Sequence, residues 1–367
     1  MKALTVLTAV ATGIGLMTAA PVFADMPDGR TTGAQTERSA ITSRFQRSFG
    51  HAGLLTIWSS NEIFGITQDK INNGMLHFNQ AENSGVLSGY RDNISTAEVP
   101  ISALVGISDH AMVYTNLSLN GFSASPDLAY ASGGIGTLTV EYLNMPSDNL
   151  TWGIGAIAQY AHTNLKQNDG KINNPWGGIR GDLLYKMNDH WALANRFVAQ
   201  WGNARSEIPL GFATLTDRQH TALTYWQSDL VGTYSDAEIG FLPAGWLMHP
   251  RLGFAIEELT NSSSINSLGT KVDKQKIHYS EGMATLRFEK PVYGPGAWSP
   301  QLEFGLKHEF VNSFDSYSNE QNFYYSSVGL GRQIGKDLFF NLAYVRYDGF
   351  RGNVRNQTFK AIFSYTF

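Results

Sequence analysis

Polar and apolar residues alternate along most of this sequence, and this pattern limits the possible folds more than any other feature. In residues 301–310, QLEFGLKHEF, the even-numbered side chains are apolar apart from His308, and the odd-numbered ones are polar or Gly. Residues 150–160 and 283–289 repeat the pattern. Alternation with a period of two predicts β-strands that have one apolar and one polar face.

The predicted strands are long enough to cross a membrane. They cover about 10 to 15 residues, whereas strands of soluble proteins are usually ~5–6 residues long. A tilted strand that crosses a bilayer needs roughly 9–11 residues. Aromatic residues also gather near the predicted strand ends, as the two interfacial girdles of a membrane barrel require. Closing such a sheet satisfies every backbone group without a long apolar run.

The links between the strands alternate in length. Short polar links are predicted at 108–110, 146–149, 188–190 and 335–337. Longer links rich in Asn, Ser and Gly are predicted near 123–133, 165–175, 203–219, 260–275, 313–321 and 348–356. Short periplasmic turns and long outer loops are typical of outer-membrane barrels.

The sequence contains twelve clear strands. They lie near 111–122, 135–144, 149–163, 176–187, 190–202, 221–233, 246–258, 277–289, 299–311, 322–333, 337–347 and 356–367. Residues 94–107 also alternate, and a partner in 71–80 or 84–91 would then give an even total of fourteen. We therefore predict an all-β fold, a transmembrane antiparallel up-and-down β-barrel of twelve or fourteen strands over residues 93–367.

Composition excludes several other classes of protein. Only 16% of the residues are charged, against roughly 25% in an average soluble domain. The absence of Cys excludes a disulfide framework and a cysteine-ligated metal site. Beyond residue 24 there is no apolar run near the ~20 residues that a spanning helix needs. A net charge of −4 without a basic patch argues against nucleic acid as a partner.

Residues 1–24 are expected to be a secretory signal peptide. Lys2 precedes an apolar and small-residue stretch at 4–20, and a small-residue site follows. Cleavage is predicted between Ala24 and Asp25.

Residues 25–92 differ from the rest of the chain. The spacing of Ile41, Phe45 and Phe49 predicts a short amphipathic helix, so this segment is expected to be partly helical. Four placements are open for it: a plug in the barrel, a segment threaded through the pore, a short passenger, or a free periplasmic segment.

Charged residues on the polar strand faces are expected to line the lumen, because Lys or Arg facing lipid at the midplane costs ~2–4 kcal/mol. The candidate pore-lining residues are Arg180, Asp182, Lys186, Arg196, Arg251, Arg287, Glu289, Glu303, Lys307 and Glu309; Glu141, Glu257, Arg346 and Lys360 belong to the same set of faces. Two interpretations are open. The charges could set the ion preference of a pore, or they could form a packed network of neutralising pairs that holds the barrel shut.

Catalytic chemistry has no support in the sequence. The nine His include no His-Glu-x-x-His spacing, and there is no Gly-x-Ser-x-Gly elbow or phosphate loop. We predict no enzymatic activity, no metal site and no cofactor.

The C-terminal residues carry the most specific signal. Phe363, Tyr365 and Phe367 share one face of the last predicted strand, and the final residue is aromatic. This ending resembles the closing strand of bacterial outer-membrane proteins. The resemblance implies that these three residues are the assembly signal read by the barrel-insertion machinery.

A longer part of the chain resembles the autotransporter β-domain. The similar stretches are 281–312 (EGMATLRFEKPVYGPGAWSPQLEFGLKHEFVN), 148–156 (DNLTWGIGA) and the closing NQTFKAIFSYTF, and the resemblance spans about residues 110–367. Only about 65 to 85 residues lie between the signal and the barrel, which is unusually short for a passenger.

This resemblance implies a translocator or pore in the bacterial outer membrane, reached after signal-peptide export. It implies outer-membrane lipids, periplasmic chaperones and the barrel-insertion machinery as partners. The alternatives are a general or substrate-selective solute channel of the porin type, a membrane-embedded enzyme, or a structural anchor.

Overall fold

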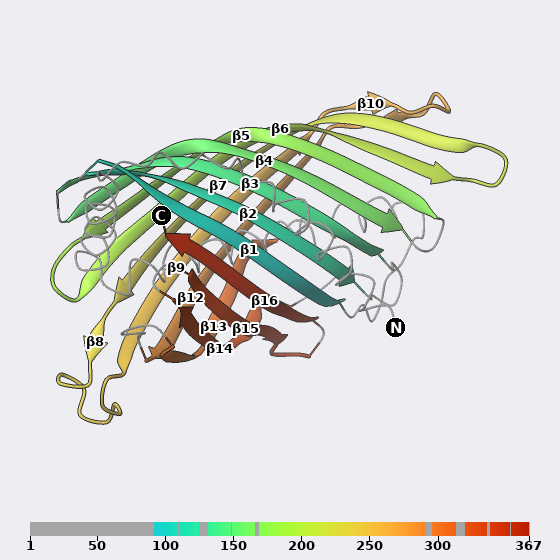
Figure 1. Cartoon of the computed structure of the whole chain (residues 1–367). Coiled ribbons are helices and arrows are strands. Elements are labelled where there is room, and N and C mark those ends of the chain that lie inside the picture. The colour runs from blue at the N-terminus through green and yellow to red at the C-terminus, as the bar shows by residue number, and fades with distance from the viewer. Residues whose placement is uncertain are drawn as a thin grey trace.

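Thirteen long strands close into one barrel (Figure 1). The computed structural model describes residues 92–366, apart from 109, 125–130, 148, 166–168, 291–295, 313–319, 336–337 and 353. Within these residues, no helix is long and apolar enough to cross a membrane.

Most of the long strands begin and end close to the positions that the alternating pattern predicts, but three of them extend six or seven residues into predicted links. In chain order they are β1 (Asp92–Ser108), β2 (Ala111–Ala124), β3 (Ala131–Ser147), β4 (Leu150–Leu165), β5 (Gly170–Lys186), β6 (Trp191–Pro209), β7 (Thr214–Gly232), β9 (Leu247–Asn261), β12 (Gln275–Glu289), β13 (Trp298–Asn312), β14 (Asn322–Ile334), β15 (Leu338–Gly349) and β16 (Val354–Thr366). Three two-residue strands lie in the connections: β8 (Tyr234–Ser235), β10 (Ser264–Ile265) and β11 (Lys271–Val272).

The barrel closes between its first and last strands in a parallel pair. All other neighbouring long strands are antiparallel, and β9 pairs with β12 across the short strands between them. Along the seam between β1 and β16, Asp92 lies opposite Val354 and Leu104 lies opposite Thr366; Figure 1 shows the two strands side by side. The described chain therefore enters the barrel at one end and leaves it at the other.

The predicted strand number was wrong, and the reason lies at this seam. All twelve clear strands are present, and residues 94–107 form most of β1. The extra partner expected in 71–80 or 84–91 falls outside the described residues. β1 needs no such partner, because it pairs with β2 on one side and with β16 on the other. A parallel closure allows the odd number that an entirely antiparallel barrel forbids.

Two of the predicted long links are largely strand. The pairing of β4 with β5 continues to Leu165 opposite Gly170, and that of β6 with β7 continues to Pro209 opposite Thr214. β7 leaves β9 earlier, where Thr221 lies opposite Asn261. The hairpin of β6 and β7 therefore projects beyond β9 (Figure 1), whereas β5 stays paired with β6 as far as Glu207.

Residues 233–246 connect β7 to β9 at the end where β16 finishes. This connection contains β8, and the backbone N–H and Oγ of Ser235 both donate to Oε2 of Glu238 at 2.8 Å. Both bonds lower the pKa of the Glu238 carboxyl below its ordinary value, and the bond from the backbone N–H has the larger effect. His190 lies 3.5 Å from the same carboxyl, so this connection is held to the neighbouring turn.

The two faces of the wall differ in exposure along every long strand. On β4 the outward Trp152, Ile154 and Tyr160 are exposed, while the inward Thr151, Ile157 and Gln159 are buried. On β13 the outward Leu302, Phe304, Leu306 and Phe310 are exposed, as the alternation predicts for a lipid-facing surface.

Candidate functional site: the inward face of the barrel

All ten predicted lumen residues lie on the inward face. Their positions alternate with the exposed apolar ones. Seven of them are buried, and the side chains of Asp182 and Arg287 are 18% and 14% exposed. Lys186 is more open, and its Nζ lies 3.5 Å from Asp189 in the following turn. The distances between these charged groups show whether they are paired with one another.

The first cluster joins β3, β5 and β6. Asp182 accepts from Nε of Arg180 at 2.6 Å and from Nε of Arg196 at 2.7 Å. Arg180 also lies 3.5 Å from Glu141. Two arginines and two carboxylates thus neutralise one another inside the wall. Gly153 makes room for this cluster, since a Cβ there would lie 2.1 Å from Oε1 of Glu141.

The second cluster runs across β7 and β9. Asp229 accepts from Nε of Arg251 at 2.9 Å and pairs with its Nη2 at 2.8 Å. Nε2 of Gln227 donates to the same carboxylate, and the hydroxyl of Tyr225 donates to Gln227 at 2.5 Å. Every member is buried, so the carboxylate finds its partners within the protein.

The third cluster surrounds Lys307 on β13. Its Nζ lies 2.5 Å from Glu281 and 3.4 Å from Glu309. The hydroxyl of Tyr279 donates to both carboxylates, at 2.9 Å to Glu309. The rings of Tyr279, Phe323 and Tyr347 lie 5.7, 5.3 and 5.1 Å from the ammonium, within the range of cation–π attraction.

The fourth cluster spans β9, β12, β13 and β14. Glu303 accepts from Oγ1 of Thr285 at 2.6 Å and from the hydroxyl of Tyr325 at 3.3 Å. Arg287 bridges Glu303 at 3.9 Å and Glu289 at 3.3 Å. His249 lies 3.4 Å from Glu289.

A separate pair crosses the parallel seam. Nζ of Lys360 on β16 lies 2.9 Å from Glu98 on β1, and the two residues are opposite each other in the register. The hydroxyl of Ser118 on β2 also donates to Glu98 at 2.9 Å. The seam is thus joined by side chains as well as by its backbone.

The sequence did not reveal every member of these clusters. Tyr225, Tyr279 and Tyr325 face inward and donate to the clusters, although an aromatic residue in a barrel strand suggests a lipid-facing position. Their positions in the alternation could have shown this: Tyr279 is two residues from Glu281, so the two side chains lie on the same strand face. Arg346 was expected inward, but it lies on the outward face near the end of β15, where Asp348 accepts from its Nε at 2.5 Å.

The described part of the assembly signal faces outward. The ring of Phe363 lies 5.0 Å from that of Phe340 on β15, and Tyr365 is exposed. Phe367 falls outside the described residues, as do Ala24 and Asp25 of the predicted cleavage site.

The cations on this face are paired. Each of the six cations among the ten predicted residues lies within 4 Å of a carboxylate oxygen. In the described part of the chain, no three His, Asp or Glu side chains are grouped as metal ligands. The chemistry of the face is therefore that of a hydrogen-bonded, self-neutralising interior.

Comparison with known proteins gives a family match. A family model described as the autotransporter β-domain matches residues 113–338, well over half of the chain and the region from β2 to the start of β15. No curated protein matches the sequence.

Solved structures with a similar fold include three barrels from autotransporters. The translocator domain of NalP from Neisseria meningitidis is 11% identical, with 77% of this chain and 91% of that chain covered and a TM-score of 0.49. The β-domain of the Bordetella autotransporter BrkA is 14% identical, with 74% and 96% covered and a TM-score of 0.44. The transport unit of AIDA-I from Escherichia coli is 17% identical, with 74% and 88% covered and a TM-score of 0.36.

Proposed function

Because the chain belongs to the autotransporter β-domain family, and is thus a translocator barrel of the bacterial outer membrane, we propose that its own residues 25–91 are the segment it delivers to the cell surface. The observation that carries this proposal is the parallel seam. Asp92 begins β1 at the end opposite Thr366, the last described residue of β16.

The orientation follows from the lengths of the turns. Four of the six links at the end where β16 finishes, at 109–110, 148–149, 187–190 and 335–337, are two to four residues long; the connections at 233–246 and 290–297 are the longer ones at that end. Short turns are typical of the periplasmic end of outer-membrane barrels. The opposite end, where Asp92 lies, then faces the outside, and the chain ahead of β1 starts from the cell surface.

We further propose that the ten inward charges seal the lumen instead of selecting ions. Buried and paired charges are held by one another, whereas a selectivity ring presents its charges to passing ions. Removing one partner would leave an uncompensated charge, which is strongly unfavourable in a buried site. This supports a barrel that is closed once its segment is outside.

The proposal includes the route by which the protein arrives. The signal peptide is cut between Ala24 and Asp25, periplasmic chaperones carry residues 25–367, and the barrel-insertion machinery assembles residues 93–367. The chain is assigned no catalytic role, cofactor or metal.

Single-cysteine labelling tests where residues 25–91 lie. The chain has no native Cys, so an impermeant maleimide reports only the introduced thiol. We expect Ser59→Cys to be labelled on intact cells, as is Asp273→Cys, whose native side chain is 84% exposed at the outer end. Asp189→Cys, at a 96% exposed site in a periplasmic turn, should be labelled only after permeabilisation. Labelling of Ser59→Cys only in permeabilised cells would overturn the proposal.

Planar-bilayer recording tests the sealed lumen. We expect low conductance from the full-length protein and from a variant that lacks residues 25–70, because the inward network is the seal. A rise after the deletion would mean that the segment acts as a plug. A stable open pore in the intact protein would instead support the solute-channel alternative.

A further inference from the structure

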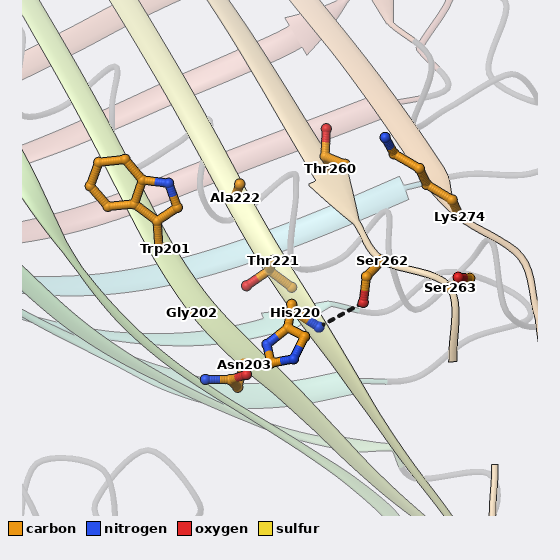
Figure 2. Close-up of a pocket in the computed structure, with 10 residues that line it drawn as sticks. All are labelled: Trp201, Gly202, Asn203, His220, Thr221, Ala222, Thr260, Ser262, Ser263 and Lys274. Atoms are coloured by element: carbon orange, nitrogen blue, oxygen red, sulfur yellow. Dashed lines mark hydrogen bonds between the residues drawn. The ribbon is translucent and has the colours of Figure 1, made fainter. Parts of the chain in front are cut away.

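A hollow of about 570 Å³ lies on the barrel wall at the outer end of β6, β7 and β9. Figure 2 shows its residues on neighbouring strands. Trp201, Ala222 and Thr260 are cross-strand partners in one row, and the small Ala222 leaves a notch between the two larger side chains. The pair Asn203 and His220 forms the next row outward.

The edge of the hollow is fixed by the loop that follows β9. The N–H of His220 donates to Oγ of Ser262 at 3.0 Å (Figure 2), and the N–H of Ser262 donates back to the carbonyl of His220 at 2.8 Å. Lys274 closes the far side just ahead of β12. These bonds make the hollow a built part of the wall.

The hollow sits just above the lipid-facing band. Phe197, Trp226 and Ile256 are partners in one outward row, and all three are exposed. Ala222 lies four residues farther out on β7, which is about 13 Å along the strand. Trp201, 58% exposed, lies at the level where an aromatic girdle meets the headgroups.

Two arginines lie beyond the hollow on its outer side. Arg205 and Arg218 lie directly opposite each other on the outward face of β6 and β7, an arrangement that is unfavourable without a counter-charge. Arg205 pairs with Glu207 at 3.1 Å. Among the residues that the structure describes, neither Arg218 nor Lys274 has an ion-pair partner.

We propose that this hollow binds the phosphorylated glucosamine headgroup of an outer-leaflet glycolipid of the lipid A type. Trp201 presents a ring face to the sugar, and Thr260 and Asn203 supply hydrogen-bonding groups for its hydroxyls. Lys274 and Arg218 face the phosphate, for which ammonium and guanidinium groups are strong donors. The acyl chains run down past Thr224 to the apolar row below the hollow. Glu258, the cross-strand partner of Thr224, is paired with Lys276 at 3.1 Å.

The size and lining favour this lipid over a simple phospholipid. A single phosphate would leave most of the volume empty, whereas the hollow falls within the ~300–1,000 Å³ range of small-molecule sites. Its lining combines an aromatic face, hydroxyls and an amide with a cation, which suits a sugar phosphate. The inference rests on the outward orientation given under Proposed function.

Binding to the purified full-length protein in detergent tests the proposal. The probes are bisphosphorylated lipid A, phosphatidylglycerol and free glucosamine 1-phosphate. Native mass spectrometry measures the binding of each one. We expect lipid A to bind at least about tenfold more tightly than phosphatidylglycerol. Lys274→Gln should weaken lipid A binding by about tenfold, the loss expected for one charge-assisted hydrogen bond. Ala222→Leu, which fills the notch, should weaken it by at least as much.

Lys271→Gln is the matched control, because Lys271 lies in the same loop, outside the hollow, and pairs with Asp273 at 2.9 Å. It should change lipid A binding less than twofold, and heat-modifiable migration on gels checks that each variant is folded. Unchanged lipid A binding in folded Lys274→Gln and Ala222→Leu, or equal binding of phosphatidylglycerol, would overturn the proposal. Binding of free glucosamine 1-phosphate without lipid A binding would also overturn it, in favour of a soluble sugar phosphate.

A separate measurement distinguishes this failure from that of the proposed function. We expect His220→Cys to be labelled by impermeant maleimide on intact cells. If labelling occurs but lipid A does not bind, only the glycolipid site is wrong. If His220→Cys is labelled only after permeabilisation, the orientation is wrong and both proposals fall.

Discussion

At the scale of single residues, glycine and buried charge are matched across the inward face. A Cβ at Gly253 would lie 2.5 Å from Oδ1 of Asp229, and one at Gly153 would lie 2.1 Å from Oε1 of Glu141. A side chain at either glycine would therefore force the nearby carboxylate to shift, since a real Cβ essentially never approaches another heavy atom so closely. The carboxylates that pair with Arg251 and Arg180 keep their positions because the neighbouring glycines have no side chain.

Lys307→Met should be strongly destabilising. The change keeps a similar apolar volume but leaves Glu281 and Glu309 buried without their cation. Breaking a buried pair by removing one partner costs about 3–5 kcal/mol. The free energy of unfolding in urea, measured on the refolded protein in lipid, checks this value.

The matched control is Lys276→Met. Lys276 pairs with Glu258 at 3.1 Å, but its side chain is 52% exposed, and exposed pairs contribute ~0–1 kcal/mol. A loss at Lys307→Met no larger than that at Lys276→Met would contradict the buried network.

Phe304→Arg tests the outward face of β13. Phe304 is exposed on the lipid side and its ring stacks on Phe288 with centroids 5.9 Å apart. An Arg facing lipid near the midplane costs ~2–4 kcal/mol. The same urea titration should show this loss, while Phe304→Leu should remain within about 1.5 kcal/mol of the wild type. A stable Phe304→Arg variant would mean that this face does not meet lipid.

At the scale of elements, an engineered disulfide between β1 and β16 tests the parallel seam directly. Ala97 on β1 and Phe359 on β16 are partners in the register, and both side chains point outward and are exposed. The variant Ala97→Cys/Phe359→Cys should form a disulfide on mild oxidation, because paired strands bring Cα atoms within the ~4.4–6.8 Å that a disulfide spans. The measurement is a change in migration of the unfolded band on a non-reducing gel.

A second pair serves as the control for this cross-link. Tyr344 on β15 and Phe359 are antiparallel partners, so Tyr344→Cys/Phe359→Cys should form a disulfide under the same conditions. If the control pair cross-links and the Ala97 pair does not, β1 and β16 do not meet in this register.

The alternation of polar and apolar residues predicted the strands where one face meets lipid. It failed to predict strand ends where both faces are polar. Residues 203–209 alternate Asn, Arg and Glu with Ala, Ser and Ile, beyond the apolar band, so they suggested a loop although they form the end of β6. The ten charged residues could be assigned to one strand face from the sequence, because their parity opposes that of the apolar residues; their role as a pore lining stays a prediction. The inward tyrosines and the pairing partners were not predicted, because cross-strand register is a tertiary property that parity alone does not give.

At the scale of the whole molecule, assembly depends on delivering the last strand. β16 pairs with both β15 and β1, and an open edge in lipid would leave backbone groups unsatisfied at several kcal/mol each. Deleting Phe367, or replacing it with Asp, should leave export intact but block insertion, because the terminal aromatic is proposed as the assembly signal. Fractionation and heat-modifiable migration on gels measure the outcome.

Phe359→Leu is the control for the terminal residue, since it lies on the same outward face earlier in β16 and stays apolar. It should assemble normally. Wild-type amounts of the heat-modifiable band from the Phe367 deletion would contradict an assembly role for that residue.

The odd strand number also limits whether the barrel could be circularly permuted. In an even-stranded barrel, the first and last strands meet at the same rim, and a short turn could join them in a circular permutant. Here the link from Thr366 back to Asp92 would have to run the height of β16, whose 13 residues span about 43 Å at ~3.3 Å per residue. It would need on the order of a dozen extended residues, and it could not cross lipid with its backbone groups unpaired. The remaining route is through the lumen, which is closed if the proposed seal holds, so this topology resists permutation in a way that its even-numbered counterparts do not.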